Sequence, residues 1–322
     1  MAFYDLPAAE LATYDPQLPT PADLRQFWDD TLSEARSFPL AVQFTPVQTP
    51  LTAVEVYDVT FAGWGGHPIK AWLLVPVHRE GRLPCIVGYL GYSAGRGYPH
   101  QWLTWPSAGF ATLVMDTRGQ GWSPHTPGAT ADPVGSGPSV PGFLTKGVES
   151  RETYYYRRVY TDAVRAIEAA RSHPRVDPDR IGLEGGSQGG GLAMAAGALC
   201  PDVRAVAANV PFLTHIRRAT EIGVEHPYAE LVQYLRSRPD RVEETFATLS
   251  YFDVAVLARL ATAPAIFAAG LMDPICPPSC CYAAFNAWGG PKEVFGYPYN
   301  QHEGGSGLHD GRVLQFFRDR LG

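Results

Sequence analysis

The fold is most evident in one segment, Arg180-Ile181-Gly182-Leu183-Glu184-Gly185-Gly186-Ser187-Gln188-Gly189-Gly190. Its first five residues have the apolar pattern of a strand, and the small, apolar residues 190–199 predict a helix. A serine between glycines at such a junction is typical of a nucleophile elbow, the sharp turn that exposes a catalytic hydroxyl. Glycines at 185 and 189 suit that turn, because they let strand and helix approach without a side chain between them. Ser187 is therefore a candidate nucleophile, and an ordinary glycine-rich turn is the alternative.

Length and composition favour one large globular domain. The chain has 322 residues, 45% of them hydrophobic, and no long linker, low-complexity block or internal repeat divides it. We therefore predict a single domain over residues 1–322. The net charge of −6 and the lack of a basic cluster argue against nucleic acid and anionic membranes as partners. These features favour a small or neutral substrate.

The chain shows no signal peptide and no apolar run of membrane-spanning length, so we expect a cytoplasmic protein. Cytoplasmic cysteines are expected to be reduced rather than bridged. Three of the five cysteines cluster near residue 280 but lack a second ligand pair at zinc spacing, so we predict no metal site. The five are Cys85, Cys200, Cys276, Cys280 and Cys281.

The order of the predicted elements indicates an α/β fold. A helix is expected over residues 21–36, and residues 53–61 and 69–76 predict an antiparallel hairpin. Short apolar runs then alternate with helical stretches, a pattern typical of a mainly parallel sheet covered by helices on both faces. The predicted strands are 84–89, 111–116, 181–184, 203–208, 265–269 and 292–297, and the predicted helices are 152–172, 187–199, 278–288 and 306–321.

Residues 211–260 interrupt this alternation with several helical stretches. We expect a helical insertion, placed before the catalytic acid and over the carboxyl edge of the sheet. Such an insertion can shape a binding pocket.

A catalytic serine needs a base, and in the α/β-hydrolase order the acid comes next and the histidine last. Asp273 follows the strand at 265–269, and His302 follows the strand at 292–297. Loops at the carboxyl ends of parallel strands meet at one edge of a sheet, so both side chains should reach Ser187. His302 would then act as general base, and Asp273 would orient its imidazole.

Each of these assignments has an alternative. Asp273 could simply begin a proline-rich turn, and His302 could lie on an ordinary surface loop. Glu303 is a second acid beside His302, although adjacent residues point in different directions. The competing histidines are His215, His226 and His309, of which the first two precede the acid and the third falls within the predicted terminal helix.

The oxyanion formed during acyl transfer needs two backbone N–H donors. We predict Gln188, which follows the nucleophile, and Tyr92, which lies in the loop after the strand at 84–89. Tyr92 could instead only line the cleft. Arg118-Gly119-Gln120 follows the next strand and is expected to brace the elbow by hydrogen bonding, with a solvated turn arginine as the alternative.

Five short elements in one order make the chain resemble carbohydrate esterase family 7, the acetyl xylan esterases and cephalosporin C deacetylases. They are Tyr89-Leu90-Gly91-Tyr92, Arg118-Gly119-Gln120, Gly185 to Gly190, Leu271-Met272-Asp273 with the Cys-Pro-Pro that follows, and His302-Glu303. The likeness extends to Tyr154-Tyr155-Tyr156-Arg157-Arg158 and to Leu249-Ser250-Tyr251-Phe252-Asp253, and so covers nearly the whole chain. One departure is Leu90, where the family commonly has a histidine.

This resemblance implies an α/β-hydrolase fold, a triad of Ser187, Asp273 and His302, and an oxyanion hole at Tyr92 and Gln188. It also implies removal of acetyl groups from small acetylated substrates through an acetyl-serine, without metal or organic cofactor. Members of the family form a hexamer, a trimer of dimers whose active sites face an internal space.

Other functions are weighed against this one. A broader short-chain carboxylesterase is the main alternative, and an aminopeptidase of the same fold is disfavoured because no propeller-type domain precedes the elbow. A non-catalytic binding protein of this fold is also conceivable, but all three triad residue types occur here in order.

Overall fold

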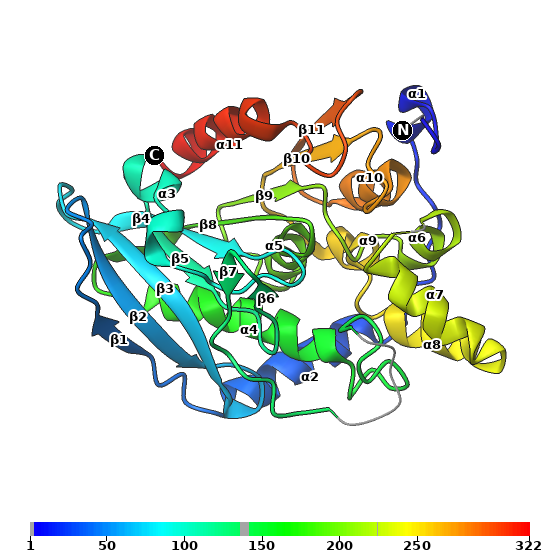
Figure 1. Ribbon diagram of the computed structural model, residues 1–322, viewed down its shortest axis with the longest axis horizontal. Helices are drawn as coiled ribbons and strands as arrows, with labels where there is room; N and C mark the ends of the chain where they lie inside the picture. Colours follow the sequence, from blue (N-terminus) through cyan, green and yellow to red (C-terminus); the bar gives the residue numbers. More distant parts are fainter. Residues whose placement is uncertain (1–2, 136–141, 224) are drawn as a thin grey trace.

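The computed structural model describes residues 3–135, 142–223 and 225–322, and Figure 1 shows a large sheet flanked by helices. The strands are β1 (Gln43–Pro46), β2 (Val54–Ala62), β3 (Pro68–Pro76), β4 (Leu83–Tyr89), β5 (Ala111–Met115), β6 (Trp122–Ser123), β7 (Thr126–Pro127), β8 (Val176–Gly186), β9 (Ala205–Asn209), β10 (Ala265–Gly270) and β11 (Lys292–Tyr297). The main sheet has the order β1-β2-β3-β5-β4-β8-β9-β10-β11. Its strands from β5 to β11 in that order pair in parallel. The predicted mainly parallel sheet with an antiparallel β2–β3 hairpin is therefore confirmed.

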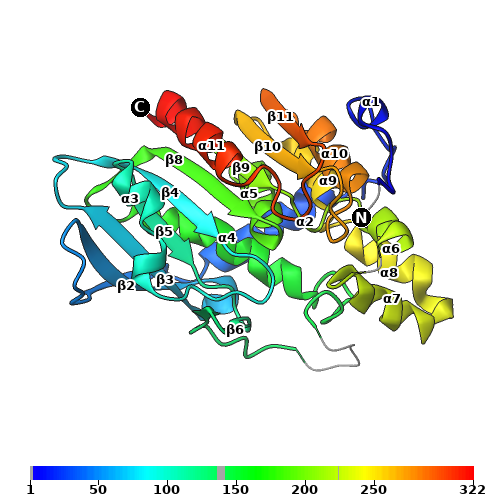
Figure 2. The same cartoon turned by 45° about the horizontal axis from the view of Figure 1, so that its top comes forward.

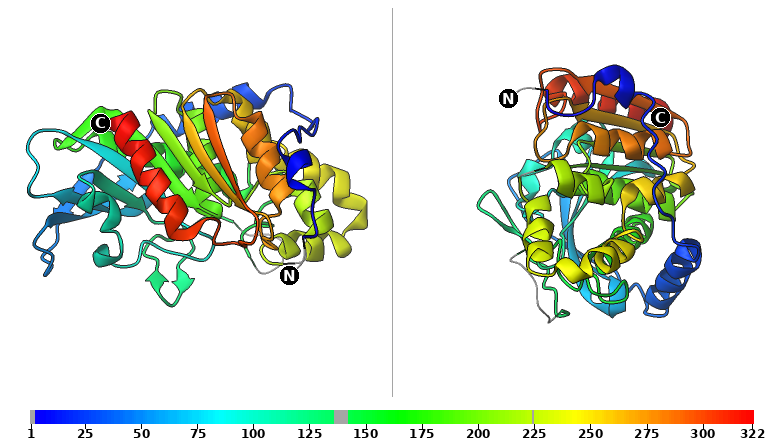
Figure 3. Two further views of the ribbon diagram at one scale, coloured as in Figure 1. Left: turned by 90° about the horizontal axis from the view of Figure 1, so that it is seen from above. Right: turned by 90° about the vertical axis from the view of Figure 1, so that its right-hand side faces the viewer.

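Helices cover both faces of the sheet (Figure 2). They are α1 (Ala8–Leu11), α2 (Leu24–Arg36), α3 (Thr104–Ser107), α4 (Tyr155–Arg171), α5 (Gln188–Leu199), α6 (Ile216–Ile222), α7 (Tyr228–Arg236), α8 (Val242–Leu249), α9 (Val254–Leu257), α10 (Pro278–Ala287) and α11 (Ser306–Leu321). One hydrophobic core lies between the sheet and α2, α4, α5, α9 and α10, and a smaller one lies beneath α3 and α11. In the left view of Figure 3, α11 runs diagonally across its face of the sheet.

Side chains along β8 alternate between the two faces of the sheet, so the strand contributes residues to both hydrophobic cores. Ile181 and Leu183 point into the larger core, whereas Gly182 faces Phe317 of α11. Successive side chains of a strand point to opposite faces, so Glu184 lies on the α11 face. An acidic residue thus occupies the apolar side of a central strand, immediately before the turn into α5.

The turn from β8 into α5 is tighter than an ordinary strand-to-helix connection. Ser187, between the two elements, has φ of 55° and ψ of −122°, a conformation that L-residues rarely adopt. A side chain at Gly189 would overlap the Tyr89 carbonyl oxygen and lie 2.7 Å from the carbonyl carbon. A side chain at Gly185 would lie 2.8 Å from the Gly189 Cα. Helix and strands can approach this closely only because both positions are glycine.

The helical insertion expected over residues 211–260 contains α6 to α9. These helices lie at the end of the sheet toward which β4 and β8 point (Figure 2). Its last helix, α9, is capped by Asp253. The buried carboxylate of Asp253 accepts hydrogen bonds from the backbone N–H groups of His215, Ile216 and Ala255 at 2.7–2.9 Å. Burial raises the pKa of Asp253 to about 6. The Asp253 side chain therefore links residues 215–216, near the start of the insertion, to α9 at its end.

Some elements differ from expectation. The first long helix begins at Leu24 rather than at residue 21, and the elbow helix begins at Gln188 rather than at 187. Strand β1 was not predicted, because its mostly exposed residues at the sheet edge lack an apolar pattern. None of the helices in the described part of the chain is both long and apolar enough to cross a bilayer.

Candidate active site

The elbow is held by its backbone on both sides. The Ser187 N–H donates to the Asn209 carbonyl at 2.9 Å, and the Ser187 carbonyl accepts from Phe212 N at 2.9 Å and Gly191 N at 3.1 Å. These bonds sustain a positive φ that costs on the order of 1–3 kcal/mol. The side chain stays partly exposed at the carboxyl edge of the sheet. Such stored strain is typical of a residue placed for chemistry rather than for packing.

Asp273 and His302 meet at this edge. His302 Nδ1 lies 2.9 Å from Asp273 Oδ2, and Asp273 Oδ1 accepts from the backbone N–H groups of Ile275 at 2.8 Å and Cys276 at 3.0 Å. The Asp273 side chain is fully buried, whereas that of His302 is 29% exposed. A buried carboxylate held by two N–H groups orients the imidazole and leaves Nε2 free to accept a proton.

The alternative residues are placed differently. Among the histidines that the structure describes, only His302 hydrogen-bonds to Asp273. His309 lies in α11 and contacts the Tyr297 hydroxyl at 3.1 Å, and burial lowers its pKa to about 4. Glu303 accepts hydrogen bonds within its own loop, from Asn300 Nδ2 at 3.0 Å and Gln301 N at 3.1 Å. Glu303 therefore shapes the loop that carries the histidine.

Cys276 is a neighbour of this pair that sequence reasoning did not assign. Single donor atoms of Asp273, Cys276 and His302 all lie within 4.8 Å of one another. However, the Asp273 carboxylate is already occupied by two N–H groups and the imidazole. Burial also raises the pKa of the Cys276 thiol well above its usual value, which disfavours the thiolate that a metal needs. The arrangement suits an oriented imidazole better than a metal centre. All five cysteines are free, as expected.

The two predicted oxyanion donors lie on either side of the elbow. Gln188 is the first residue of α5, where backbone N–H groups have no partner within the helix. Tyr92 is anchored through its hydroxyl, which contacts both Glu230 carboxylate oxygens at 2.8 and 2.9 Å and accepts from Phe143 N at 2.5 Å. The hydroxyl therefore ties the Tyr92 loop to α7 of the insertion.

Glu230 was missed by sequence reasoning. It is 4% exposed, and burial raises its pKa. It also accepts from Leu144 N at 3.2 Å, so one carboxylate joins the insertion, the Tyr92 loop and the segment after residue 142. An acid in the first turn of a helix gives little local signal, since acids are common there and most of them face solvent.

The Gln188 side chain ties the elbow to two other loops. Its Oε1 accepts from Gln120 Nε2 at 2.8 Å and from the Tyr156 hydroxyl at 3.0 Å, and its Nε2 donates to the Leu90 carbonyl at 3.2 Å. Gln120 Oε1 in turn accepts from Ser93 N at 2.8 Å, one residue beyond Tyr92. Two buried carboxamides therefore fix the separation between the loops that carry the predicted oxyanion donors.

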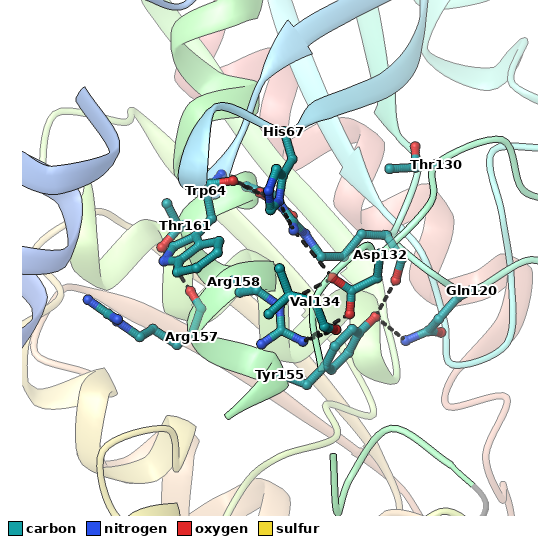
Figure 4. Close-up of polar contacts among 12 residues, drawn as sticks. Trp64, His67, Gln120, Thr130, Asp132, Val134, Tyr155, Arg157, Arg158 and Thr161 are labelled. Carbon is teal, nitrogen blue, oxygen red and sulfur yellow. Dashed lines mark hydrogen bonds and ion pairs between the residues drawn. The ribbon is translucent and has the colours of Figure 1, made fainter. Parts of the chain in front are cut away.

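Arg118 lies in a buried ionic network, part of which is drawn in Figure 4. Its side chain is fully buried and binds Asp162 through Nε at 2.5 Å and Nη2 at 2.7 Å. Asp132 lies 3.5 Å from Arg118 Nη1 and pairs with Arg158 at 2.9 Å and Lys146 at 2.7 Å. The alternative of a solvated turn arginine is therefore wrong. Removing one partner of such a network leaves a buried charge uncompensated, at a cost of about 3–5 kcal/mol.

This network reaches the elbow through a tyrosine. The Tyr155 hydroxyl donates to the Arg118 carbonyl at 2.6 Å and accepts from Gln120 Nε2 at 3.1 Å, as Figure 4 shows for Tyr155 and Gln120. Gln120 Nε2 also donates a hydrogen bond to Gln188 Oε1. The Arg118-Gly119-Gln120 turn is thus placed by buried charge on one side and holds the elbow on the other.

Residues near the start of the chain support the acid loop. The Tyr4 hydroxyl donates to the Asp273 carbonyl. Asp5 accepts from Ser279 N in the first turn of α10 at 2.7 Å and from Arg218 of α6 at 2.9 Å. These contacts join residues far apart in sequence, so no local pattern could have predicted them.

Leu90 and Phe212 also lie beside the site. Leu90 is 5% exposed and lines a cavity behind the elbow rather than the front of the site. Phe212 is fully buried, with its ring centroid 4.6 Å from that of Tyr228 and 6.1 Å from that of Tyr92. Phe212 therefore packs behind Tyr92 and limits how far that ring can move.

Comparison with protein families gives one match over nearly the whole chain. The family model described as acetyl xylan esterase (AXE1) matches residues 1–320. Acetyl esterase Axe7A of Xylanibacter ruminicola is 29% identical over 295 residues, which cover 89% of this chain. The chain spans 64% of the length of that relative.

Solved structures agree with that match. An acetyl xylan esterase from Paenibacillus sp. R4 superposes with a TM-score of 0.92 and 38% identity, covering 98% of this chain and all of the other. Acetyl xylan esterase 1 from Thermoanaerobacterium sp. JW/SL YS485 gives a TM-score of 0.91 and 32% identity, covering 99% of this chain and all of the other. The similarity therefore includes the insertion as well as the sheet.

The buried carboxamide of Gln120 offers a test of how the elbow is held. Gln120→Leu keeps most of the volume but leaves Gln188 Oε1 and Ser93 N without this partner. Ser93 N is then left unpaired, whereas Gln188 Oε1 keeps the Tyr156 hydroxyl as a donor. We expect a loss of about 1–3 kcal/mol in the free energy of unfolding for the unpaired Ser93 N, together with a fall in kcat for ester hydrolysis. Denaturant unfolding and steady-state kinetics measure the two effects.

Gln315→Leu, on the exposed face of α11, is the matched control and should change neither quantity by much. An unchanged kcat in Gln120→Leu would show that the elbow keeps its geometry without this bond.

Proposed function

The chain belongs to the acetyl xylan esterase family, a family of carboxylic ester hydrolases, and on this basis we propose that it hydrolyses acetyl esters through Ser187, Asp273 and His302. The observation that supports this most directly is the 2.9 Å contact between His302 Nδ1 and the buried Asp273 carboxylate, at the sheet edge where Ser187 follows β8. An elbow serine and an oriented imidazole are the requirements of acyl transfer.

In the first half-reaction, His302 Nε2 takes the proton of the Ser187 hydroxyl while Oγ attacks the acetyl carbonyl carbon. The carbonyl oxygen becomes an oxyanion, which the N–H groups of Tyr92 and Gln188 stabilise. One such donor contributes about 3–4 kcal/mol to lowering the barrier. The carbon–oxygen bond to the alcohol then breaks, and the alcohol leaves with the proton from His302. An acetyl-serine remains.

In the second half-reaction, water replaces the alcohol. His302 takes a proton from the water as its oxygen attacks the acetyl carbonyl, and the same N–H groups hold the second oxyanion. Acetate leaves when the bond to Ser187 Oγ breaks, and the proton returns to Oγ. Asp273 stays ionised throughout and stabilises the imidazolium in both halves.

We propose small acetylated molecules as substrates, among them acetylated xylo-oligosaccharides and cephalosporin C. The relatives named above are an acetyl esterase and acetyl xylan esterases. Tyr92 is fixed by Glu230 and supported by the buried Phe212, so the space for the acyl group has a rigid aromatic boundary. A rigid boundary favours acetyl over longer acyl groups.

Replacing the nucleophile tests the assignment. Ser187→Ala should lower kcat for p-nitrophenyl acetate by at least about four orders of magnitude, because the attacking oxygen is lost. It should also abolish labelling by a fluorophosphonate serine reagent. Ser107→Ala, at an exposed serine that ends α3, is the control and should keep both properties. Near-normal activity in Ser187→Ala would refute the proposed nucleophile.

The length of the acyl group separates an acetyl esterase from a broader carboxylesterase. We expect kcat/KM to fall from p-nitrophenyl acetate to the butyrate and to the octanoate, since the acyl space is bounded by a fixed ring. Initial-rate measurements on the three esters decide this. Equal rates for octanoate and acetate would favour the broader carboxylesterase.

We also propose that the chain forms the hexamer implied by its family resemblance, a trimer of dimers whose active sites face an internal space. Such a space would admit oligosaccharides and exclude polymeric xylan. Light scattering should give a solution mass of six chains, and a monomeric mass would contradict the proposal.

A further inference from the structure

A cavity of about 340 Å³ lies behind the elbow, on the face of the sheet covered by α3 and α11. Small residues of the central strands form its floor, and Trp105 and α11 form its walls. Ser187, Asp273 and His302 are not among its lining residues, although Gly185 and Gly186 are. The cavity is therefore a neighbour of the catalytic centre on the other side of the elbow.

Unpartnered polar atoms gather at this cavity. In the described part of the chain, six buried side-chain nitrogen or oxygen atoms lack a hydrogen-bond partner, and three of them belong to residues that line it: Thr112 Oγ1, Asn209 Oδ1 and His309 Nε2. Thr112 and His309 are each 1% exposed. Leaving a buried polar atom unpaired costs about 1–3 kcal/mol, so such atoms are normally satisfied. Half of these unpartnered atoms thus belong to residues around one cavity.

The cavity also contains negative charge. Glu184 reaches it from β8, and its one hydrogen bond in the described structure comes from Trp105 Nε1 at 3.1 Å. Asp310 stands at the exposed mouth, on α11. Burial raises the pKa of both carboxyl groups. A bound cation would offset that desolvation, because a nearby opposite charge favours the ionised carboxylate.

The walls offer acceptors but few free donors. The indole N–H groups of Trp102 and Trp105 are already used, by the Arg96 carbonyl at 2.7 Å and by Glu184. Asn209 Oδ1 and the ionised carboxylates can only accept hydrogen bonds, whereas the Thr112 hydroxyl and the His309 imidazole can donate or accept them. An occupant with several N–H donors and a positive charge would complement these acceptors. Leu90 and Trp105 also line the cavity, and they provide apolar and aromatic surface for the carbon atoms of an occupant.

We propose that this cavity is a second binding site that takes a small organic ammonium ion, with its N–H groups directed at Glu184 and Asn209 and its carbon atoms against Trp105. This site does not depend on the proposed function. A primary ammonium carries three donors, which matches the acceptors on the walls. Inorganic cations fit less well, because the cavity is large and half-lined by apolar groups.

The test uses benzylammonium as the probe and benzyl alcohol as its neutral counterpart. Isothermal titration calorimetry is carried out on the full chain with Ser187 blocked by a diethyl phosphoryl group, which closes the catalytic centre. We expect one benzylammonium per chain and at least tenfold weaker binding of the alcohol, since a charged hydrogen bond to a carboxylate is worth about 1.5–3 kcal/mol.

Two variants locate the site. Glu184→Gln removes the charge and keeps the shape, and should weaken benzylammonium binding about tenfold or more. Asp310→Asn, at the exposed mouth, should fold normally and weaken binding by a smaller factor. Glu293→Gln, on an exposed position of β11, is the matched control and should bind like the unaltered chain.

Three results would overturn the proposal. Loss of binding when Ser187 is blocked would place the amine in the catalytic centre. Equal affinity for the alcohol would show that charge is not recognised. No heat of binding from either probe would mean that water fills the cavity.

Discussion

The backbone of Ser187 is the constraint on which the site depends. Its positive φ is tolerated only because Asn209 and Phe212 hold the serine by hydrogen bonds on both sides and because glycines let α5 lie against β4. The strands β4, β8 and β9 lie side by side in the sheet. This order places the end of β4, the Asn209 carbonyl and Phe212 around the serine together. The fold therefore does more than carry the serine, since the sheet register itself sets the direction in which the hydroxyl points.

The polar interior has a matching role. The Arg118 side chain forms a buried ion pair with Asp162. Gln120, in the same turn, donates a hydrogen bond to the Gln188 carboxamide, so the ion pair and the elbow are held by one rigid turn. Each group in this chain of contacts is buried and paired, so a shift at one end cannot be absorbed by solvent. The proposed oxyanion donors, the N–H groups of Tyr92 and Gln188, consequently keep their spacing without help from substrate. Preorganisation of this kind is what makes such donors effective.

The sequence predicts the parts of this molecule whose signals are local. Strand periodicity and the elbow glycines each involve a few neighbouring residues, and the parallel sheet follows from the periodicity. The candidates Asp273 and His302 are found because each follows a locally recognisable strand in the known order of acid and histidine. Glu230 and Tyr4 could not be found in this way, because their partners lie on distant elements. Glu184 is intermediate: the sequence shows an acid on a central strand, but only the structure shows that its carboxylate lies beside Trp105, which donates a hydrogen bond to it.

The bond between Tyr4 and the Asp273 carbonyl spans 269 positions of the chain. Contacts of such high sequence separation are costly in loop entropy and are expected to form late in folding. The strands and the elbow can assemble from much shorter separations. Recovery of full activity during refolding is therefore expected to lag behind recovery of secondary structure. The onset of activity thus reports when residues near the start of the chain have packed against the acid loop.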